Sequence, residues 1–419
     1  MSGREPKVVE PTARSTVLCR LLAIGLLSLV AATWKLWTPQ SVFPQVPLIR
    51  AACELPGWID WTCLAVLIVA SVTLLISARP GRLRRITATV IASALAAYFV
   101  LDQHRLQPWA WQFFLLSFLL AFADDRTVRR GWVWLVISIY FWSAVSKLDY
   151  TFCHDQGPAL IRGLKHAIGI RGMPNRWTES IDIGAALVLA LGELVVAILL
   201  SFARTRPVGL WAATVMHLGL LLALGPLGLN HSHGVLLWNL FFIAQDWLLF
   251  GHRSASCPVE ARPANPASFR QRVVLVFLGL VVVWPALELV GYCDHWLGWA
   301  VYSARSDQAD VIANPDVDLE SAINRTIDNR LLIAPWSLQQ LAVPVYPQHR
   351  FLIGVVLDRA EHHHFRGTLV LKKTPDRFSG QPAGQNLMIP VEDAAAVELK
   401  RVADTFFWNA RPRRLSSGH

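Results

Sequence analysis

Charged residues are scarce in this chain of 419 residues. Asp, Glu, Lys and Arg make up only 16% of it, whereas an ordinary soluble protein carries about 25%. This shortage excludes a disordered chain and a highly charged nucleic-acid binder. The six cysteines form no Cys-x-x-Cys pair, which excludes a thioredoxin-type dithiol and gives no signal of a metal centre. No repeat of solenoid period is present, so a stacked repeat architecture is excluded as well.

Long apolar runs dominate what is present. Hydrophobic residues account for 54% of the chain, and 18 of its residues are Trp. A helix needs about 20 apolar residues to cross the hydrocarbon core of a bilayer, and nine runs approach that length. The sequence therefore predicts an all-α polytopic membrane bundle of about nine transmembrane helices, which occupies residues 17–291 in the lipid bilayer. The predicted spans are 17–36, 58–77, 86–101, 108–123, 131–147, 183–203, 207–226, 233–250 and 272–291.

Positive charge is distributed unevenly between the two ends of these spans. Connections on the side of the N-terminus carry 17 Lys and Arg residues, and those on the other side carry 8. Since Lys and Arg concentrate in cytoplasmic loops, the N-terminal segment 1–16 is predicted to be cytoplasmic. An odd number of spans then places the 148–182 loop and the C-terminus in a periplasm or lumen.

Residues 292–419 differ in composition from the bundle. Acidic and basic residues balance there, at 14 each, and no run is long enough to span a membrane. Apolar residues at helical spacing predict helices over 348–361 and 391–409, and alternation predicts a strand over 368–373. We therefore expect a small extracytoplasmic α+β C-terminal domain over residues 292–419.

Three cysteines, Cys53, Cys153 and Cys293, fall on the predicted outer side of the membrane. Disulfides persist in oxidising compartments, so one disulfide among these three is an alternative to three free thiols. Their positions in the sequence do not select which two would pair.

Among the ionisable residues within the predicted spans or at their ends, five stand out: Lys147, Glu193, His217, Asp246 and Glu288. A charge at membrane depth costs about 3 kcal/mol on insertion scales, so each residue is a candidate for function. Each also has a structural interpretation. Lys147 would extend its amine to the headgroups, Glu193 would be a neutral hydrogen-bonded acid, and His217 would be neutral with both nitrogens satisfied. Asp246 and Glu288 are expected at the membrane interface.

Three short motifs follow one another between residues 140 and 218. The first is YFWSAVSKLD at 140–149 with GPAL at 157–160, the second is LGEL at 191–194, and the third is MHL at 216–218. Their order and spacing resemble the vitamin K-dependent gamma-carboxylase family. More broadly, they resemble the horizontally transferred transmembrane domain that contains this family. The resemblance covers about residues 17–310 and implies the same membrane domain.

The resemblance implies a quinol-dependent oxygenation or carboxylation enzyme, a lyase or oxygenase that uses a reduced naphthoquinone as cofactor. In the carboxylases, the lysine that matches Lys147 is the base that deprotonates reduced vitamin K, after which oxygen and carbon dioxide react. Desolvation at the membrane boundary disfavours the ammonium form of a lysine, which agrees with this role. A periplasmic protein or peptide would be the partner. With Lys147 as base, Glu193 and His217 would orient the ring or relay protons, Asp149 and His154 would assist at the outer mouth, and Tyr140 and Trp142 would contact the cofactor.

Two alternatives belong to other functional classes. A non-catalytic membrane module would hold lipid or quinone and anchor the periplasmic tail, and its function would depend on the tail rather than on Lys147. A small-solute transporter would favour broken helices at matching positions of two halves. The nine runs show no such duplication, which argues against the transporter.

Overall fold

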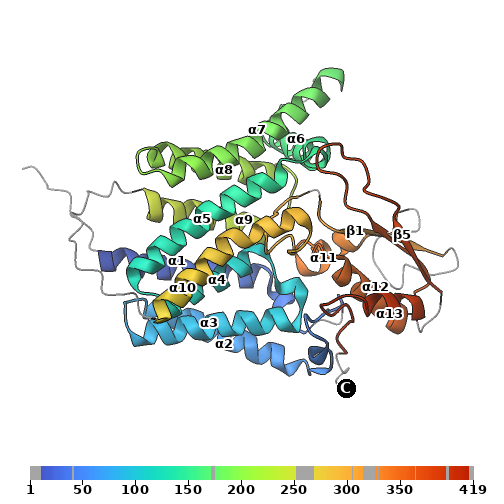
Figure 1. Cartoon of the computed structure of the whole chain (residues 1–419), viewed down its shortest axis with the longest axis horizontal. Helices are drawn as coiled ribbons and strands as arrows, with labels where there is room; N and C mark the ends of the chain where they lie inside the picture. Colours follow the sequence, from blue (N-terminus) through green and yellow to red (C-terminus); the bar gives the residue numbers. More distant parts are fainter. Residues whose placement is uncertain are drawn as a thin grey trace, which may run out of the picture.

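The computed structural model describes residues 11–39, 42–170, 175–251, 269–303, 305–314, 326–327, 330–363, 365–392 and 396–414. Within these residues the chain is mostly helical, and the helices before residue 291 form one bundle (Figure 1). Contacts between them follow a circuit from α1 to α5, then through α7, α8 and α9 back to α1. The helices are α1 (Pro11–Ala32), α2 (Trp58–Ile76), α3 (Arg82–Leu101), α4 (Pro108–Phe122), α5 (Asp125–Lys147), α6 (Gly157–Ala167), α7 (Asn175–Ser201), α8 (Arg206–Leu224), α9 (His233–Phe250) and α10 (Phe269–Val283).

Seven of the described helices are long and apolar enough to cross a membrane: α1, α2, α3, α7, α8, α9, and α10 together with the 3₁₀ turn Trp284–Val290 that follows it. Helices α5 and α6 reach this composition only as a pair, and an 89° bend separates them. Helix α4 is apolar but has 15 residues. Several helices of this length and composition are typical of a multi-pass membrane protein. A helix covers most of every predicted apolar run, while residues 1–10 of the predicted N-terminal segment lie outside the described residues.

Helix α6 is missing from the sequence prediction, which treated residues 148–182 as a loop. Its buried residues include Gly157, Leu160 and Gly163, which recur every three positions, and the exposed Arg162 lies between them. Such an amphipathic helix has too few consecutive apolar residues to be found by a search for apolar runs. Helix α6 packs against α7 and α8, and Lys165 forms an ion pair with Asp182 of α7.

The loops that the charge count assigned to one side of the membrane gather at one end of the bundle, together with the C-terminal tail (residues 292 onward). The backbone N–H of Asn409 donates to Leu48 O at 3.1 Å, and that of Tyr150 donates to Arg377 O at 2.8 Å. In the loop between α8 and α9, the ring of His231 lies 6.0 Å from that of Tyr302. The alternation of connections between two ends therefore holds for these loops.

The tail contains a five-stranded antiparallel sheet in the order β2-β3-β1-β4-β5. Helix α12 contacts both β1 and α13, and α13 contacts β5, so the two helices pack with the sheet as an α+β unit at the end of the bundle (Figure 1). The tail elements are β1 (Gln308–Ala313), β2 (Thr326–Ile327), β3 (Arg330–Leu331), α11 (Ile333–Leu341), α12 (His349–His363), β4 (Gly367–Lys372), β5 (Leu387–Val391) and α13 (Val397–Ala403).

Two of the three elements predicted in the tail match the structure closely. Helix α12 covers most of the predicted 348–361 helix, and β4 covers most of the predicted 368–373 strand. The predicted helix over 391–409 is wrong in extent, because Val391 ends strand β5 and α13 is short. The pairing of Val391 with Gly367 in β4 is a long-range contact, and such contacts override local helical spacing.

The tail shares its hydrophobic core with the bundle loops. Phe43, in the segment between α1 and α2, lies 4.4 Å from Trp336 and 6.5 Å from Phe351 between ring centroids. Gly354 of α12 approaches so closely that a Cβ there would lie 2.7 Å from a methyl group of Val46. One contiguous set of buried apolar residues therefore continues from the helices into the tail.

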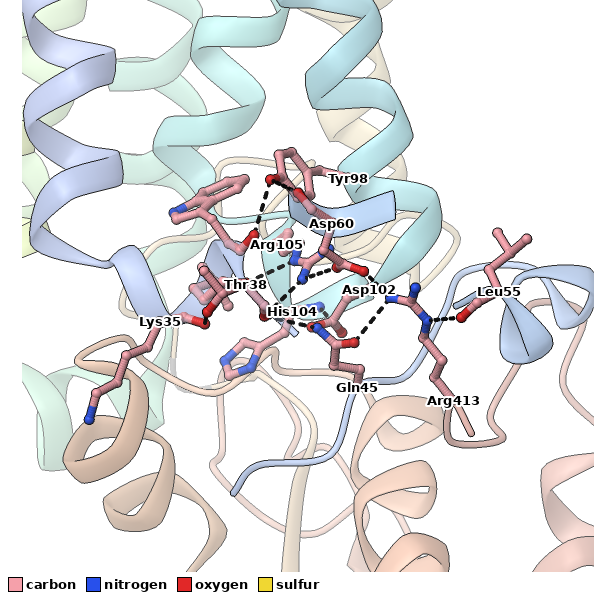
Figure 2. A network of polar contacts seen from close by, with 12 residues as sticks. Lys35, Thr38, Gln45, Leu55, Asp60, Tyr98, Asp102, His104, Arg105 and Arg413 are labelled. Carbon is pink, nitrogen blue, oxygen red and sulfur yellow. Dashed lines mark hydrogen bonds and ion pairs between the residues drawn. The ribbon is translucent and has the colours of Figure 1, made fainter. Parts of the chain in front are cut away.

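A buried ion cluster also joins the tail to the bundle (Figure 2). The carboxylate of Asp60 lies 2.5 Å from Arg105 and 2.7 Å from Arg413, and all three side chains are fully buried. The carbonyl of Asp60 accepts a hydrogen bond from the Tyr98 hydroxyl at 2.8 Å, and Arg413 donates to Leu55 O at 2.9 Å. The cluster connects α2, α3, the loop after α3 and the C-terminal segment.

Next to this cluster, the loop between α3 and α4 holds two buried titratable residues. Asp102 accepts hydrogen bonds from the backbone N–H groups of Val46 and His104, and His104 Nε2 lies 3.0 Å from Pro344 O in the tail. Burial raises the pKa of Asp102 to about 6 and lowers the pKa of His104 to about 4. Both residues are therefore more easily kept neutral in the folded protein than in the unfolded chain.

These opposite pKa shifts predict a change in pH dependence for the variant Asp102→Asn. Asp102 contributes stability at low pH that is lost as the pH rises through about 6, and His104 contributes stability above about 6.5 that is lost as the pH falls through about 4. The two contributions oppose each other in the wild type. In Asp102→Asn only the His104 contribution remains. As the pH falls from about 6.5 to about 4, we therefore expect the variant to lose about 3 kcal/mol more unfolding free energy than the wild type.

Denaturant unfolding in detergent at several pH values measures this difference. His104→Gln leaves only the aspartate contribution and should change stability in the opposite direction. Parallel pH curves for wild type and both variants would contradict the prediction.

The cysteines give no disulfide within the described part of the chain. Cys19, Cys53, Cys63, Cys153 and Cys293 are all free thiols, so none of the three cysteines that were predicted on the outer side is paired. Burial raises the pKa of the Cys53 and Cys153 thiols, which lowers the fraction of reactive thiolate. Cys257 lies outside the described residues.

Candidate functional site

A cavity of about 620 Å³ lies where α5, α7, α8 and α9 meet the tail. Its walls are largely apolar on the bundle side, where Leu189, Leu220 and Phe242 contribute. On the other side it is closed by tail residues from the turn around Trp296 and from strand β1. Helices α5, α7, α8 and α9 also contribute polar side chains, among them Tyr140, Ser143, Lys147, Glu193, His217 and Asn239.

Helix α5 supplies three of these polar residues from one face. Tyr140, Ser143 and Lys147 are spaced at i, i+3 and i+7, which places them above one another on a helix. All three are buried against the neighbouring helices. The YFWSAVSK motif therefore presents a polar stripe to the cavity in an otherwise apolar helix.

Lys147 forms the first polar group of the site. Its Nζ lies 2.7 Å from Glu193 Oε2 on α7 and 2.5 Å from Ser143 Oγ. The side chains are only 8% and 14% exposed for Lys147 and Glu193, so the amine does not extend to the headgroups. The sequence reasoning expected a desolvated lysine, and the structure adds an acidic partner on α7.

Tyr140 is the centre of the second polar group. Its hydroxyl oxygen lies 2.7 Å from His217 Nε2 and 2.5 Å from Asp246 Oδ2. His217 Nδ1 lies 2.8 Å from Asn239 Oδ1, so both ring nitrogens of His217 are occupied. The His217 ring also stacks on Phe242, with centroids 5.0 Å apart. The expected satisfied histidine is present, and it belongs to a chain of four polar residues.

Two acidic residues were expected at the membrane interface. For Asp246 this expectation is wrong, because the residue is only 1% exposed and lies inside the bundle against Tyr140. Glu288 lies at the tail end of the bundle, where it pairs with His295 at 2.9 Å.

Three of the residues proposed from the resemblance do not line the cavity. The Asp149 carboxylate accepts hydrogen bonds from the backbone N–H groups of Thr151 and Phe152 and caps the turn after α5. Burial raises the pKa of Asp149. His154 is exposed and stacks on Tyr150, and Trp142 donates its indole N–H to Val282 O at 2.7 Å. Of the seven site residues predicted from the resemblance, the cavity thus brings together Lys147, Glu193, Tyr140 and His217.

The tail closes the cavity with further polar groups. Lys372 and Asp310 form an ion pair at 3.1 Å across strands β4 and β1. The Tyr302 hydroxyl is buried and has no hydrogen-bond partner among the described residues. Burial also lowers the pKa of His231, which lies beside Tyr302. The cavity is therefore lined by polar groups from both the bundle and the tail, among largely apolar walls.

No family model, no curated protein and no solved structure matches this chain. The interpretation of the site rests on its geometry.

Sequence reasoning missed Ser143, Asn239 and Tyr302, and it assigned no role in the site to Asp246. Three of these four residues had a usable signal in the sequence. Ser143 shares the helical face of Tyr140 and Lys147, and Asn239 and Asp246 lie seven residues apart on one face of α9. Tyr302 had none, because its position depends on how the tail folds against the bundle.

Proposed function

We propose that the protein is a multi-pass membrane enzyme that binds a reduced naphthoquinone in this cavity, with Lys147 as the base that takes a proton from its hydroxyl. The observation that carries the proposal is the Lys147 amine at the cavity wall, 2.7 Å from Glu193 and 2.5 Å from Ser143. An amine placed between an acid and a hydroxyl in an apolar cavity is suited to proton transfer. The reaction would be a quinol-dependent oxygenation or carboxylation.

The dimensions and lining of the cavity fit a quinol. Sites for small molecules usually occupy about 300–1,000 Å³, with apolar walls and a few polar groups that fix orientation. The cavity here has about 620 Å³. Lys147 and Tyr140 can receive one hydroxyl end, and the unpartnered Tyr302 hydroxyl is a donor for the other oxygen.

A reduced quinone, when bound, supplies the reducing electrons for oxygen chemistry. The protein's own part is to bind, orient and deprotonate. As the ligand O–H bond breaks, an N–H bond forms on Lys147, and the ligand anion left behind stabilises the resulting ammonium. The amine must be neutral when the ligand arrives, and Glu193 is the adjacent group that can hold the proton of the pair. Ser143 fixes the direction of the amine.

The orientation in the membrane is part of this proposal. We place the N-terminus in the cytoplasm and the tail in a periplasm or lumen, as the excess of Lys and Arg on the opposite connections favours. In this orientation a quinone reaches the cavity from the bilayer, and a polar acceptor such as a periplasmic protein or peptide reaches it from the tail side.

A second candidate is a non-catalytic module that holds lipid or quinone. It is favoured by the continuity of the cavity from the bundle into the tail, because a ligand bound there would stabilise the contact between the two parts. This candidate predicts ligand binding without conversion of the ligand.

Calorimetric titration of the purified full-length protein with reduced menadione, under anaerobic conditions, tests the ligand site. We expect saturable binding that Leu189→Trp weakens at least tenfold, because Leu189 lines the cavity and the larger ring fills it. Val188→Trp is the matched control, since Val188 is the adjacent residue of α7 and is 67% exposed. Equal binding by both variants would rule out the cavity as the site.

A further inference from the structure

Asp246 is a fully buried acid that has no role in the proposed reaction. Its side chain does not line the cavity, and only its Oδ2 has a partner, the Tyr140 hydroxyl at 2.5 Å. Oδ1 is buried without a hydrogen-bond partner among the described residues. A carboxylate would leave this oxygen charged and unsolvated, so the arrangement favours the neutral acid.

The direction of each hydrogen bond in the row Asp246–Tyr140–His217–Asn239 can be assigned by starting at Asn239. The Asn239 amide nitrogen donates to Val235 O at 2.8 Å, which leaves Asn239 Oδ1 as the acceptor facing His217 Nδ1 at 2.8 Å. His217 Nδ1 must therefore carry a hydrogen. In a neutral imidazole, Nε2 is then an acceptor, and the Tyr140 hydroxyl donates to it across 2.7 Å.

The direction of the last hydrogen bond follows from this count. The Tyr140 hydroxyl has one hydrogen, which it gives to His217, so the short contact with Asp246 must be donated by Asp246. The same contacts also fit an ionised state, with an imidazolium at His217, a carboxylate at Asp246 and the Tyr140 hydrogen reversed. The two states differ only by the movement of two hydrogens along the chain. The neutral state avoids two separated buried charges, while the nearest ionisable groups, Lys147 and Glu193, already contact each other.

We infer that Tyr140 and His217 form a proton relay that meets the cavity at Tyr140, and that a neutral Asp246 sets its direction. Tyr140 lines the cavity, and its oxygen can accept a hydrogen bond from a ligand hydroxyl. When that hydroxyl ionises, its O–H bond breaks, a new O–H bond forms on Tyr140, and the former Tyr140 hydrogen moves to His217 Nε2. The products are a ligand anion and an imidazolium. Asp246 is a positioning residue, since its hydrogen directs that of Tyr140 toward His217.

This role for the relay rests on the proposed function, which supplies the ligand hydroxyl. The relay provides His217 as a proton acceptor in addition to Lys147. Lys147 lies two helical turns beyond Tyr140 on α5. The arrangement of hydrogens within the relay does not depend on any ligand, and it can be tested in the resting protein.

Infrared spectroscopy of the full-length protein in lipid nanodiscs tests the relay. At neutral pH we expect a carbonyl band of a protonated carboxyl group that is lost in Asp246→Asn. In Tyr140→Phe the same band should move to higher frequency, because the acid loses its hydrogen-bond partner. Asp182→Asn is the matched control, since Asp182 is a buried aspartate held in an ion pair with Lys165, and it should leave the band unchanged.

Two outcomes would overturn the inference. An acid band that is the same in wild type and Asp246→Asn would mean that Asp246 is ionised at rest. A band that is lost in Asp246→Asn but does not move in Tyr140→Phe would mean an isolated acid without a relay. Nitrogen-15 NMR of histidine-labelled wild type gives a reading without any variant, with hydrogen expected on Nδ1 of His217 and not on Nε2.

Reduced menadione separates this inference from the proposed function. A shift of the acid band on addition of reduced menadione would support contact between the ligand and the relay. If menadione does not bind but the resting spectra are as expected, the proposed function fails and the hydrogen arrangement of the relay is retained.

Discussion

Lys147→Met should reduce the formation of quinone epoxide from reduced menadione and oxygen by at least about 100-fold, the usual contribution of a positioned general base. Methionine keeps the length and apolar contacts of the side chain but cannot accept a proton. Binding of reduced menadione should change by less than about threefold, since the apolar walls of the cavity are untouched. Mass spectrometry of the quinone products measures the first quantity, and calorimetric titration measures the second.

Lys165→Met is the matched control for this prediction. Lys165 also forms a lysine–carboxylate pair between two helices of the bundle, with Asp182, but it does not line the cavity. Epoxide formation should therefore persist in Lys165→Met. Equal epoxide formation by Lys147→Met and wild type would reject Lys147 as the base. A wild-type protein that binds reduced menadione and forms no epoxide would favour the non-catalytic module.

Asp60→Ala should lower the unfolding free energy by about 3–5 kcal/mol, the usual result when one partner of a buried ion pair is removed. The substitution leaves Arg105 and Arg413 fully buried without their shared carboxylate. Because Arg413 belongs to the C-terminal segment, we also expect the tail to become more sensitive to limited proteolysis. Denaturant unfolding in detergent measures the free energy, and the cleavage rate measures the attachment of the tail.

Asp404→Ala provides the comparison for an exposed acid in the same region. Asp404 pairs with Arg411 at 2.6 Å, and its side chain is 46% exposed. Exposed ion pairs contribute about 1 kcal/mol or less, so this variant should be close to wild type. A loss in Asp60→Ala that is no larger than in Asp404→Ala would show that the buried cluster does not hold the tail.

Much of the bundle follows from local sequence, for a physical reason. In a bilayer the backbone must satisfy its own hydrogen bonds, so a long apolar run has to form a helix. Every predicted run contains a helix in the structure. Helix α6 escaped detection because its apolar residues are spaced on one face and do not form a run. The 391–409 segment was misjudged because β4 pairs with Val391, a contact that helical spacing does not encode.

The candidate site could also be predicted from the sequence only in part. Tyr140, Ser143 and Lys147 could be placed on one face from sequence alone, because helical spacing is a local property. Lys147 with Glu193, and Tyr140 with Asp246, meet only because α5 packs against α7 and α9.

The sequence by itself therefore determined the apolar helices, the polar stripe on α5 and the uneven charge of the connections. Only the tertiary structure decided that Asp246 is buried beside Tyr140, that Asp60 holds Arg413 of the tail, and that the tail closes the cavity. Helices form from neighbours a few residues apart, whereas these contacts join residues far apart in the chain, whose packing no local pattern specifies.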